Sequence, residues 1–431
     1  MKAARHPSSD QTLGASRPRP KLSTAGRPAW VEVDLEFLAH NFGVLRDRAG
    51  ERQLAAVVKA DAYGHGAVAV SRILEREGVE WLAVAFVEEG IELRESGIAA
   101  PILVFGGYAR SELPLFREFD LTAAVSSQEQ LDVWIQACGA GSRDSSQSGK
   151  ASGELRLQNW TQSIHLKVDT GMARLGFSAT DVESAVEKIG ACPGLKLAGI
   201  FSHLCHADKP DDEISVSRTL EQRSKFDAIL AKLAPSVVSD LSIHLENSAS
   251  LLHHELNRGF LVRCGLALYG IDPVGRPTRS DRSDRSSAGV LLRPVMRVIS
   301  RLVQVRSVPK GTPTGYGGTW TAPRKSSLAV VPVGYADGYR RSLANRAEVL
   351  IRGSRASVVG AVSMDMVVVD VTACRGEVGD EVVLLGKQGE SEISVYELSE
   401  LAATIPYELL AGFGLRLPKR YRSGSEKTAE I

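Results

Sequence analysis

A lysine stands directly after an apolar run, where a buried amine could react with an aldehyde. The run covers residues 54–58, and Lys59 is the next residue. A lysine at the end of a buried strand is unfavourable unless its amine is used. Burial favours the neutral amine, which attacks an aldehyde to form a Schiff base. A solvated lysine at a strand end gives the same pattern, so Lys59 alone leaves both interpretations open.

Two other patterns compete for the chemistry. Gly64, Gly66 and Ala69 fit G-x-G-x-x-A between a predicted strand and a predicted helix, as in a dinucleotide fold. In that fold the first glycine follows the strand directly, whereas five residues intervene here. His203 and His206 form His-x-x-His, which could supply two metal ligands, but the sequence offers no third ligand nearby.

The elements that would position these residues alternate between β-rich runs and helical patterns. The β-rich runs cover 54–58, 82–85, 102–105, 121–125, 164–168, 197–201, 241–245 and 260–262. Helical spacing of apolar residues appears between them, for example at 67–77, 181–189 and 215–233. Eight β runs alternating with helices predict an α/β fold with a TIM-type (β/α)8 barrel, whose site lies at the carboxyl ends of the strands. Polar residues follow six of the runs: Lys59, Ser126, Asp169, His203, Asn247 and Arg263.

After about residue 290 the chain changes to Val-rich runs separated by Gly and Pro, which predicts a mainly β C-terminal domain. We therefore divide the chain into a disordered tail (1–27), the barrel (28–275), a linker (276–289), the β domain (290–422) and a second tail (423–431). The segment 139–153 is of low complexity and is predicted to be a surface insertion.

Composition restricts the class of protein. The 52 basic residues nearly balance the 51 acidic ones, so the sequence indicates no nucleic-acid partner and no membrane-adhesive face. No apolar run reaches the roughly 18 residues of a membrane span. Five scattered cysteines without a Cys-x-x-Cys pair favour a reducing cytoplasm over a disulfide framework.

Ordered motifs across residues 28–420 resemble those of alanine racemases. The motifs occupy 57–66, 167–176, 202–203, 246–248, 263–270, 334–338, 363–365 and 405–408. The resemblance implies an isomerase that interconverts L-alanine and D-alanine with pyridoxal 5'-phosphate as cofactor and supplies D-alanine for peptidoglycan. It also implies a homodimer with shared active sites.

The resemblance assigns two bases. Lys59 would bind pyridoxal phosphate and later act as one base. Racemisation removes a proton from one face of a planar carbon and delivers a proton to the other, so two opposed bases are the simpler design. The second base would be Tyr335, supplied by the β domain of the other subunit. A phenol with a pKa near 10 needs cationic neighbours to serve as a base.

The remaining site residues follow from the same resemblance. Arg263 would donate to the pyridine nitrogen and so disfavour decarboxylation and transamination. His203 would pack on the cofactor ring. The phosphate would be bound by hydroxyls and backbone amides of Tyr63, Ser248, Gly265, Leu266 and Tyr407.

The resemblance also assigns substrate binding to Arg174, which would bind the carboxylate, and to Met364 and Asp365 of the partner subunit. Lys167 matches a lysine that relatives often carry as a carbamate, an anion that would support Arg174; an unmodified lysine paired with Asp169 is the alternative.

Two positions depart from the pattern. Ala173 stands where many members have Gly or Asn, and Ala361 stands where Arg is often found near the channel to the site. Strict alanine specificity is therefore less secure than racemisation.

Two functions of other classes share the barrel. A carrier that binds pyridoxal phosphate without turnover resembles the barrel half alone, and here a full β domain with Tyr335 argues against it. Barrel decarboxylases of amino acids place an acid near the pyridine nitrogen, where this chain has Arg263.

Overall fold

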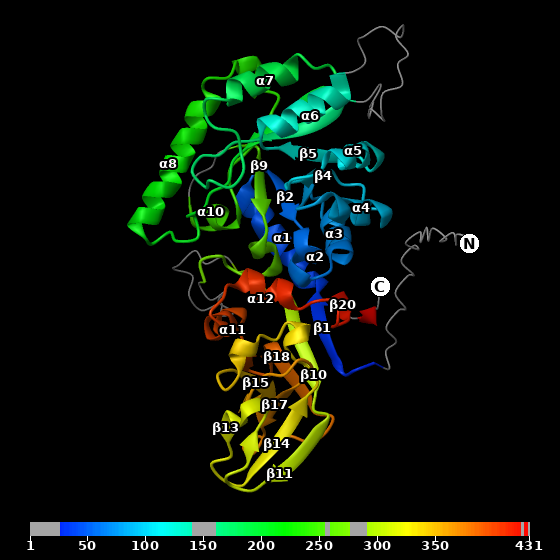
Figure 1. The fold of residues 1–431 in the computed structure, drawn as a ribbon, viewed down its shortest axis with the longest axis vertical. Coiled ribbons are helices and arrows are strands. Elements are labelled where there is room, and N and C mark those ends of the chain that lie inside the picture. Colours follow the sequence, from blue (N-terminus) through cyan, green and yellow to red (C-terminus); the bar gives the residue numbers. More distant parts are fainter. Residues whose placement is uncertain (1–25, 140–160, 255–258, 276–290, 424–425, 430–431) are drawn as a thin grey trace, which may run out of the picture.

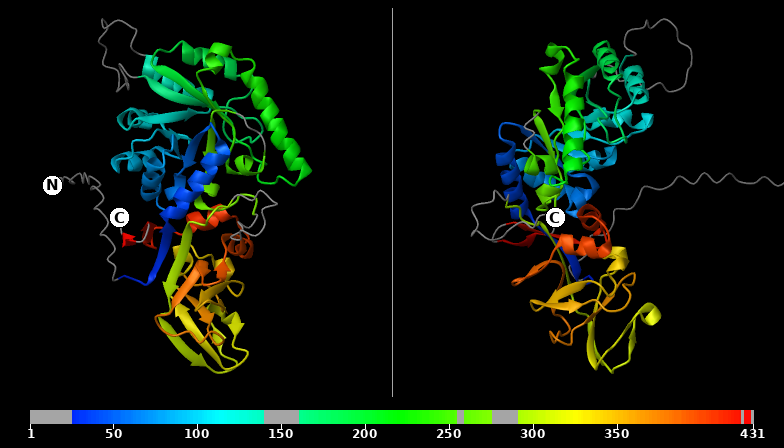
Figure 2. Two further views of the ribbon diagram at one scale, coloured as in Figure 1. Left: turned by 180° about the vertical axis from the view of Figure 1, so that it is seen from behind. Right: turned by 90° about the vertical axis from the view of Figure 1, so that its left-hand side faces the viewer.

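The structure, a computed structural model, describes residues 26–139, 161–254, 259–275, 291–423 and 426–429. A barrel occupies one end of the elongated molecule and a mainly β domain the other (Figures 1 and 2). The predicted fold class is confirmed. Residues 1–25 of the predicted tail, nearly all of the predicted insertion and the predicted linker lie outside the described residues.

All eight predicted β runs become strands of one parallel sheet in the order β8-β7-β6-β5-β4-β3-β2-β9. A parallel bridge between Asn247 and Arg263, just after β8 and within β9, joins the two ends of this order. The closed order excludes the open sheet of a dinucleotide fold. The strands are β2 (Gln53–Val57), β3 (Trp81–Val84), β4 (Ile102–Val104), β5 (Leu121–Val125), β6 (Gln162–Lys167), β7 (Leu195–Phe201), β8 (Ser242–His244) and β9 (Leu261–Cys264).

Helices cover the outside of the barrel. Their ends follow local signals: Asp34 accepts a hydrogen bond from the Phe37 amide at the start of α1, and Gly50 ends that helix with a positive φ. The helices are α1 (Leu35–Ala49), α3 (Ala67–Arg76), α4 (Val87–Glu95), α5 (Leu113–Glu118), α6 (Gln128–Gly139), α7 (Val182–Gly190), α8 (Glu213–Leu230), α9 (Pro235–Val238) and α10 (Ser248–His253). No helix in the described ranges is long and apolar enough to cross a membrane.

The β domain is built on a sheet in the order β16-β15-β18-β10-β1-β20-β21, with β19 paired to β18. Its strands are β1 (Ala29–Asp34), β10 (Met296–Arg301), β15 (Glu348–Ile351), β16 (Ser354–Ser357), β18 (Glu381–Gln388), β19 (Ser391–Ile393), β20 (Lys419–Ser423) and β21 (Glu426–Ala429). A smaller sheet contains β11 (Gln304–Val308), β14 (Ser326–Val331) and β17 (Val367–Asp370), and β12 (Pro313–Thr314) pairs with β13 (Trp320–Thr321).

The strand β1 corrects the predicted domain boundary. The barrel was predicted to begin at residue 28, but β1 pairs with β10 and β20 of the β domain. The first barrel strand is β2. An isolated β run carries no information about which sheet it joins, because pairing is decided by tertiary contacts.

Two helices that sequence analysis did not predict lie at the junction of barrel and β domain (Figure 1): α11 (Val395–Ala402) and α12 (Pro406–Gly412). Helix α12 packs closely on the residues after β2, since a Cβ on Gly64 would lie 2.4 Å from the Leu410 carbonyl oxygen. This contact brings Tyr407, on α12, to the mouth of the barrel.

Candidate active site

A cavity of about 510 Å³ opens at the carboxyl ends of the barrel strands. Ten of the thirteen predicted site residues line it, and the other three do not. The ten are Lys59, Tyr63, Lys167, Arg174, His203, Ser248, Arg263, Gly265, Leu266 and Tyr407. Residues that sequence analysis did not assign also line the cavity, among them Phe105, Phe201, Cys205 and Asn247.

Lys59 is presented by a left-handed turn. The four residues Ala60–Tyr63 all have φ between +52° and +54°, although none is glycine. A left-handed conformation costs roughly 1–2 kcal/mol per non-glycine residue, so the turn persists only if its surroundings hold it. Burial, and secondarily the charge of Arg174, lowers the pKa of the Lys59 amine. The neutral amine is the form that reacts with an aldehyde.

Side chains from several elements hold this turn. Glu89 accepts the Ala60 amide at 2.6 Å. Asp61 accepts the Ala67 amide at 2.8 Å and pairs with Lys419 of β20 at 2.7 Å. His65 Nδ1 lies 2.9 and 3.1 Å from the carbonyl oxygens of Ala62 and Tyr63. These supports could not be predicted from the sequence because they depend on contacts with β20 and α4, and only the charged residue types indicated them.

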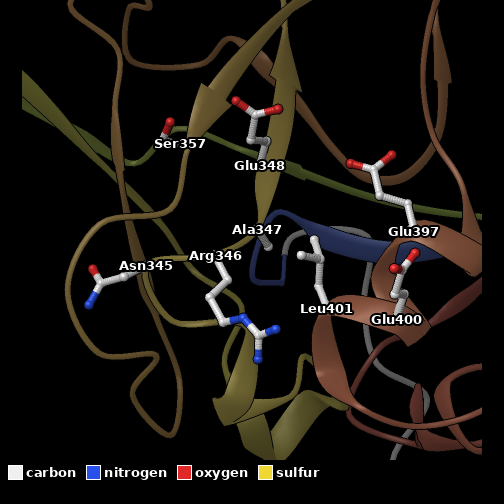
Figure 3. A pocket seen from close by; sticks show the side chains of 8 residues that line it. All are labelled: Asn345, Arg346, Ala347, Glu348, Ser357, Glu397, Glu400 and Leu401. Carbon is white, nitrogen blue, oxygen red and sulfur yellow. The ribbon is translucent and has the colours of Figure 1, made fainter.

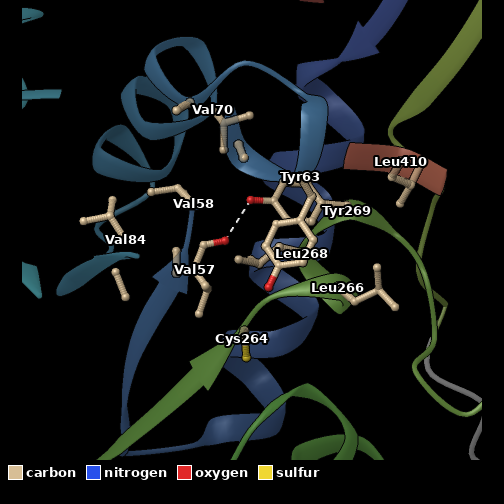
Figure 4. Packing of buried hydrophobic residues seen from close by; sticks show 14 of the residues in the cluster. Val57, Val58, Tyr63, Val70, Val84, Cys264, Leu266, Leu268, Tyr269 and Leu410 are labelled. Carbon is tan, nitrogen blue, oxygen red and sulfur yellow. Dashed lines mark hydrogen bonds between the residues drawn. The ribbon is translucent and has the colours of Figure 1, made fainter. Parts of the chain in front are cut away.

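The predicted phosphate-binding residues form a cradle. A Cβ on Gly265 would lie 2.7 Å from Tyr63 Oη, so glycine leaves the space that the phenol occupies. The Gly265 amide donates to Ser248 Oγ at 2.8 Å, and the rings of Tyr63 and Tyr407 lie 5.9 Å apart. Tyr63 and Leu266 belong to one buried cluster, part of which is drawn in Figure 4. Hydroxyls and backbone amides gathered in this way fit a phosphate dianion.

Arg263 contacts two histidines, and one of them contacts a third. Its Nη1 donates to His244 Nδ1 at 3.0 Å, and its Nη2 donates to His203 Nδ1 at 3.2 Å. Because arginine only donates, both acceptor nitrogens carry no hydrogen. His244 then donates from Nε2 to His165 Nδ1, 2.8 Å away. These contacts fix one neutral tautomer of each imidazole and hold Arg263 in place.

Because several histidines are buried, we expect the free energy of unfolding to fall in mild acid. Burial lowers the pKa of His65 to about 4, and burial with the Arg263 charge lowers that of His165 to about 3 and that of His244 well below its usual value. The unfolded chain, with pKa values near 6.5, therefore takes up protons that the folded chain does not, and stability falls as the pH drops below 6.5. Each histidine contributes about 1.4 kcal/mol per pH unit in this window. Urea unfolding at pH 7.5 and 5.5 checks this; equal unfolding free energies would contradict it.

Lys167 and Arg174 both line the cavity. Burial, and secondarily the charges of Arg174 and Arg263, lowers the pKa of Lys167 to about 8. Asp169 is not paired with Lys167 within 4.0 Å in the described structure. Its Oδ1 instead accepts the amides of Gly171, Met172 and Ala173 at 2.8–3.2 Å. This carboxylate shapes the loop that carries Arg174.

Ala173 has a left-handed conformation with φ +56°, which explains why glycine and asparagine suit this position. We expect Ala173→Gly to raise the free energy of unfolding by about 0.5–1 kcal/mol, because it removes the Cβ strain in the folded loop. Chemical denaturation measures the change, with Ala173→Val as a matched variant that should destabilise. A glycine variant less stable than the parent would show that this loop is not strained.

Tyr335, Met364 and Asp365 lie outside the cavity, on one exposed surface of the β domain. The Tyr335 amide donates to the Ser363 carbonyl at 3.0 Å, and the Ala336 amide to the Met364 carbonyl at 3.1 Å. These bonds tie the Tyr335 turn, η5 (Tyr335–Asp337), to the loop of Met364 and Asp365. The Tyr335 side chain is 42% exposed and that of Met364 52%.

A buried carboxylate anchors this surface. Asp337 is fully buried and pairs with both terminal nitrogens of Arg27, at 2.7 and 2.8 Å. Arg416 bridges Asp337 and Asp365, at 3.3 and 2.6 Å. Arg27, the last residue of the predicted tail, thus helps to fix the turn that carries Tyr335.

We also considered a metal site and a second hollow as candidate functional sites. In the described ranges, no three His, Cys, Asp or Glu side chains are placed to share a metal ion, so His203 and His206 gain no third ligand there. A second hollow, of about 390 Å³, lies on the β domain and is lined by Arg346, Glu348, Glu397 and Glu400 among others (Figure 3). Glu348 and Glu397 both pair with Arg355.

Comparisons with known proteins cover both ends of the molecule. Residues 33–273 match the family model described as "Alanine racemase, N-terminal domain", and residues 295–421 match "Alanine racemase, C-terminal domain". The alanine racemase of Sorangium cellulosum is 40% identical over 410 residues, which span 92% of this chain and 99% of the relative. That of Geobacter sp. (strain M21) is 40% identical over 402 residues, with the same two coverages.

Solved structures with a similar fold are also alanine racemases. Alanine racemase from E. faecalis superposes with a TM-score of 0.80 at 32% identity, over 92% of this chain and 98% of that one. The Bacillus anthracis enzyme with bound L-Ala-P gives 0.81 at 29% identity, over 95% and 99%. The Bartonella henselae enzyme with covalently bound pyridoxal phosphate gives 0.77 at 25% identity, over 92% and 100%.

Proposed function

The chain belongs to the alanine racemase family and interconverts L-alanine and D-alanine, and we propose that two bases from two chains, Lys59 and Tyr335, carry the proton. One observation supports this most strongly: ten predicted site residues line one cavity, while Tyr335, Met364 and Asp365 share an exposed surface elsewhere. A site whose parts lie on two surfaces of one chain is completed when a second copy brings them together.

The tyrosines and the histidine assigned to this cavity are poor proton-transfer partners for Lys59. Burial raises the pKa of Tyr407 to about 12 and raises that of Tyr63 further, so neither phenol gives up its proton readily. Burial and the Arg263 charge lower the pKa of His203 to about 3, too weak a base to hold a proton at neutral pH. Tyr335 of a second chain is therefore our choice for the opposite base.

Pyridoxal 5'-phosphate, when bound, supplies a ring that delocalises the charge left after Cα loses its proton. Lys59 would hold the cofactor, the cradle around Gly265 would bind the phosphate, and neutral His203 would pack on the ring. Arg263 stays protonated, because burial lowers its pKa only to about 10. It can only donate, so a ring nitrogen facing it stays unprotonated, which disfavours decarboxylation and transamination.

The substrate carboxylate would meet Arg174 on its Asp169-shaped loop, with Met364 and Asp365 of the second chain on the other side. D-alanine made in this way would supply peptidoglycan. The five cysteines are all unpaired, which favours a cytoplasmic location.

We expect Lys167 to carry a carbamate. Its lowered pKa provides neutral amine, which adds to the carbon of CO₂ and releases one proton, so the product is an anion beside Arg174. Intact mass at neutral pH should exceed the sequence mass by one CO₂, and acid should remove the difference. Lys167→Ala is the matched control; a mass excess that survives in this variant would place the modification elsewhere.

Incubation of the holoenzyme with L-alanine in deuterated water tests the activity. We expect optical rotation to disappear while deuterium appears at Cα. Release of carbon dioxide would instead indicate a decarboxylase. Bound cofactor without any turnover would indicate a carrier. Gel filtration with light scattering tests the assembly, and a fully active monomer would contradict the shared site.

A further inference from the structure

A third, smaller cavity lies at the junction between the barrel and the β domain. Its volume is about 130 Å³. We call it the seam cavity and define it by His65 and Tyr269 of the barrel, Met296, Ile393 and Val395 of the β domain, and Leu410 of α12. None of the predicted site residues lines it. Its wall is mainly apolar, and His65 is the fully buried polar side chain in that wall.

The His65 ring has one nitrogen that no protein group satisfies. Nδ1 lies within hydrogen-bonding distance of two carbonyl oxygens, which only accept, so Nδ1 carries the hydrogen. The ring is neutral, and Nε2 is therefore a bare acceptor. Nε2 is buried and has no partner among the protein atoms of the described structure. Leaving a buried acceptor unsatisfied costs about 1–3 kcal/mol.

The same ring belongs to the support of the Lys59 turn. It stacks on Tyr269 at 4.4 Å between ring centroids, and Tyr269 in turn contacts Tyr63 at 5.0 Å. Tyr269 Oη donates to the Val57 carbonyl at 2.9 Å, the bond drawn in Figure 4. Tyr269 thus separates the cavity at the barrel mouth, lined by Tyr63, from the seam cavity, lined by His65. An occupant of the seam cavity would lie against the ring that closes the left-handed turn.

We propose that the seam cavity binds a small neutral molecule, a water or a short-chain alcohol, whose hydroxyl group donates a hydrogen bond to His65 Nε2. The acceptor requires a donor. The apolar wall favours a neutral one, and the carboxylate of Glu392, also in the wall, already pairs with Lys387 at 3.5 Å. A water needs only about 10–15 Å³ of such volume, so the cavity has room for an alcohol as well.

A crystal structure of the holoenzyme tests for the donor. We expect an ordered oxygen atom about 2.7–3.2 Å from Nε2. A site without electron density at that distance would overturn the proposal. Titration with 2,2,2-trifluoroethanol, followed by fluorine NMR, then separates the two occupants. Saturable binding identifies an alcohol site, and an ordered oxygen without saturable binding identifies a water site. Equal binding of 2,2,2-trifluoroethyl methyl ether, which has no hydroxyl, would overturn the requirement for a donor.

Three variants, one at His65 and two at Ile393, assign the occupant to this cavity. His65→Asn keeps an N–H near the position of Nδ1 and removes Nε2. We expect it to keep the visible absorption of the lysine-bound cofactor and to lose the ordered oxygen. Ile393→Phe fills the cavity from β19 while His65 itself is unchanged, and it should also lose the ordered oxygen. Ile393→Leu, of equal volume, should retain it. An ordered oxygen that persists in both His65→Asn and Ile393→Phe would overturn the assignment, and the Ile393 pair decides if His65→Asn fails to fold.

Discussion

Lys59→Ala should abolish racemisation, with a loss of more than about 10⁴-fold in kcat, the upper range for one general base. The loss exceeds that of a single base because the change also removes the amine that we propose holds the cofactor. The visible absorption of the lysine-bound cofactor should disappear at the same time. Racemase assays and absorption spectra of the purified variant measure the two effects.

The neighbouring cavity lysine provides the control. Lys167→Ala removes an amine from the same cavity but not the one at the left-handed turn, so its visible absorption should persist. Added methylamine should restore part of the activity of Lys59→Ala by replacing the missing amine. A Lys59→Ala variant that keeps its visible absorption would show that the cofactor is attached elsewhere.

Tyr335→Phe should lower racemisation by about 10²–10⁴-fold, the usual contribution of a positioned acid or base. The variant keeps the ring, so the turn bonded to Ser363 and the Asp337 anchor should be undisturbed. The visible absorption should stay intact because Lys59 is unchanged. In deuterated water, exchange at Cα should continue from one enantiomer, through Lys59 on its own face, and be suppressed from the other.

Tyr339→Phe is the matched control, since Tyr339 lies in the same domain, is fully buried outside the cavity, and its hydroxyl has no hydrogen-bond partner among the described residues. It should leave racemisation at the level of the parent. If Tyr335→Phe exchanged Cα–H of both enantiomers equally fast, Tyr335 would not be a base.

The barrel was predictable because each strand is a short apolar run bounded by turn residues, and eight of them alternate with helical spacing. Strand β1 could not be assigned to its sheet, because its pattern is the same whether it pairs with a barrel strand or with β10. Helices α11 and α12 were missed because they are short, of 8 and 7 residues, and lie in a stretch dominated by β patterns.

The motifs that form the candidate site could be predicted from the sequence, but their arrangement in space could not. Lys59 by its position looks like any strand-end lysine, and the resemblance at Arg263 and Tyr335 gave it a role. The supports were not predictable: His244 and His165 are single histidines in separate strands, and only the fold places them in a chain behind Arg263. The link from Asp61 to Lys419 joins residues from opposite ends of the sequence for the same reason.

A mixture of two inactive variants tests the shared site most directly. Lys59→Ala and Tyr335→Phe chains, allowed to exchange subunits at equal concentration, form hybrid dimers in which one of two sites contains both Lys59 and Tyr335. With random pairing, half the dimers are hybrid, so we predict recovery of up to about one quarter of the parent activity per chain. Activity that stays at the level of the separate variants, while mass analysis shows hybrid dimers, would contradict a site built from two chains.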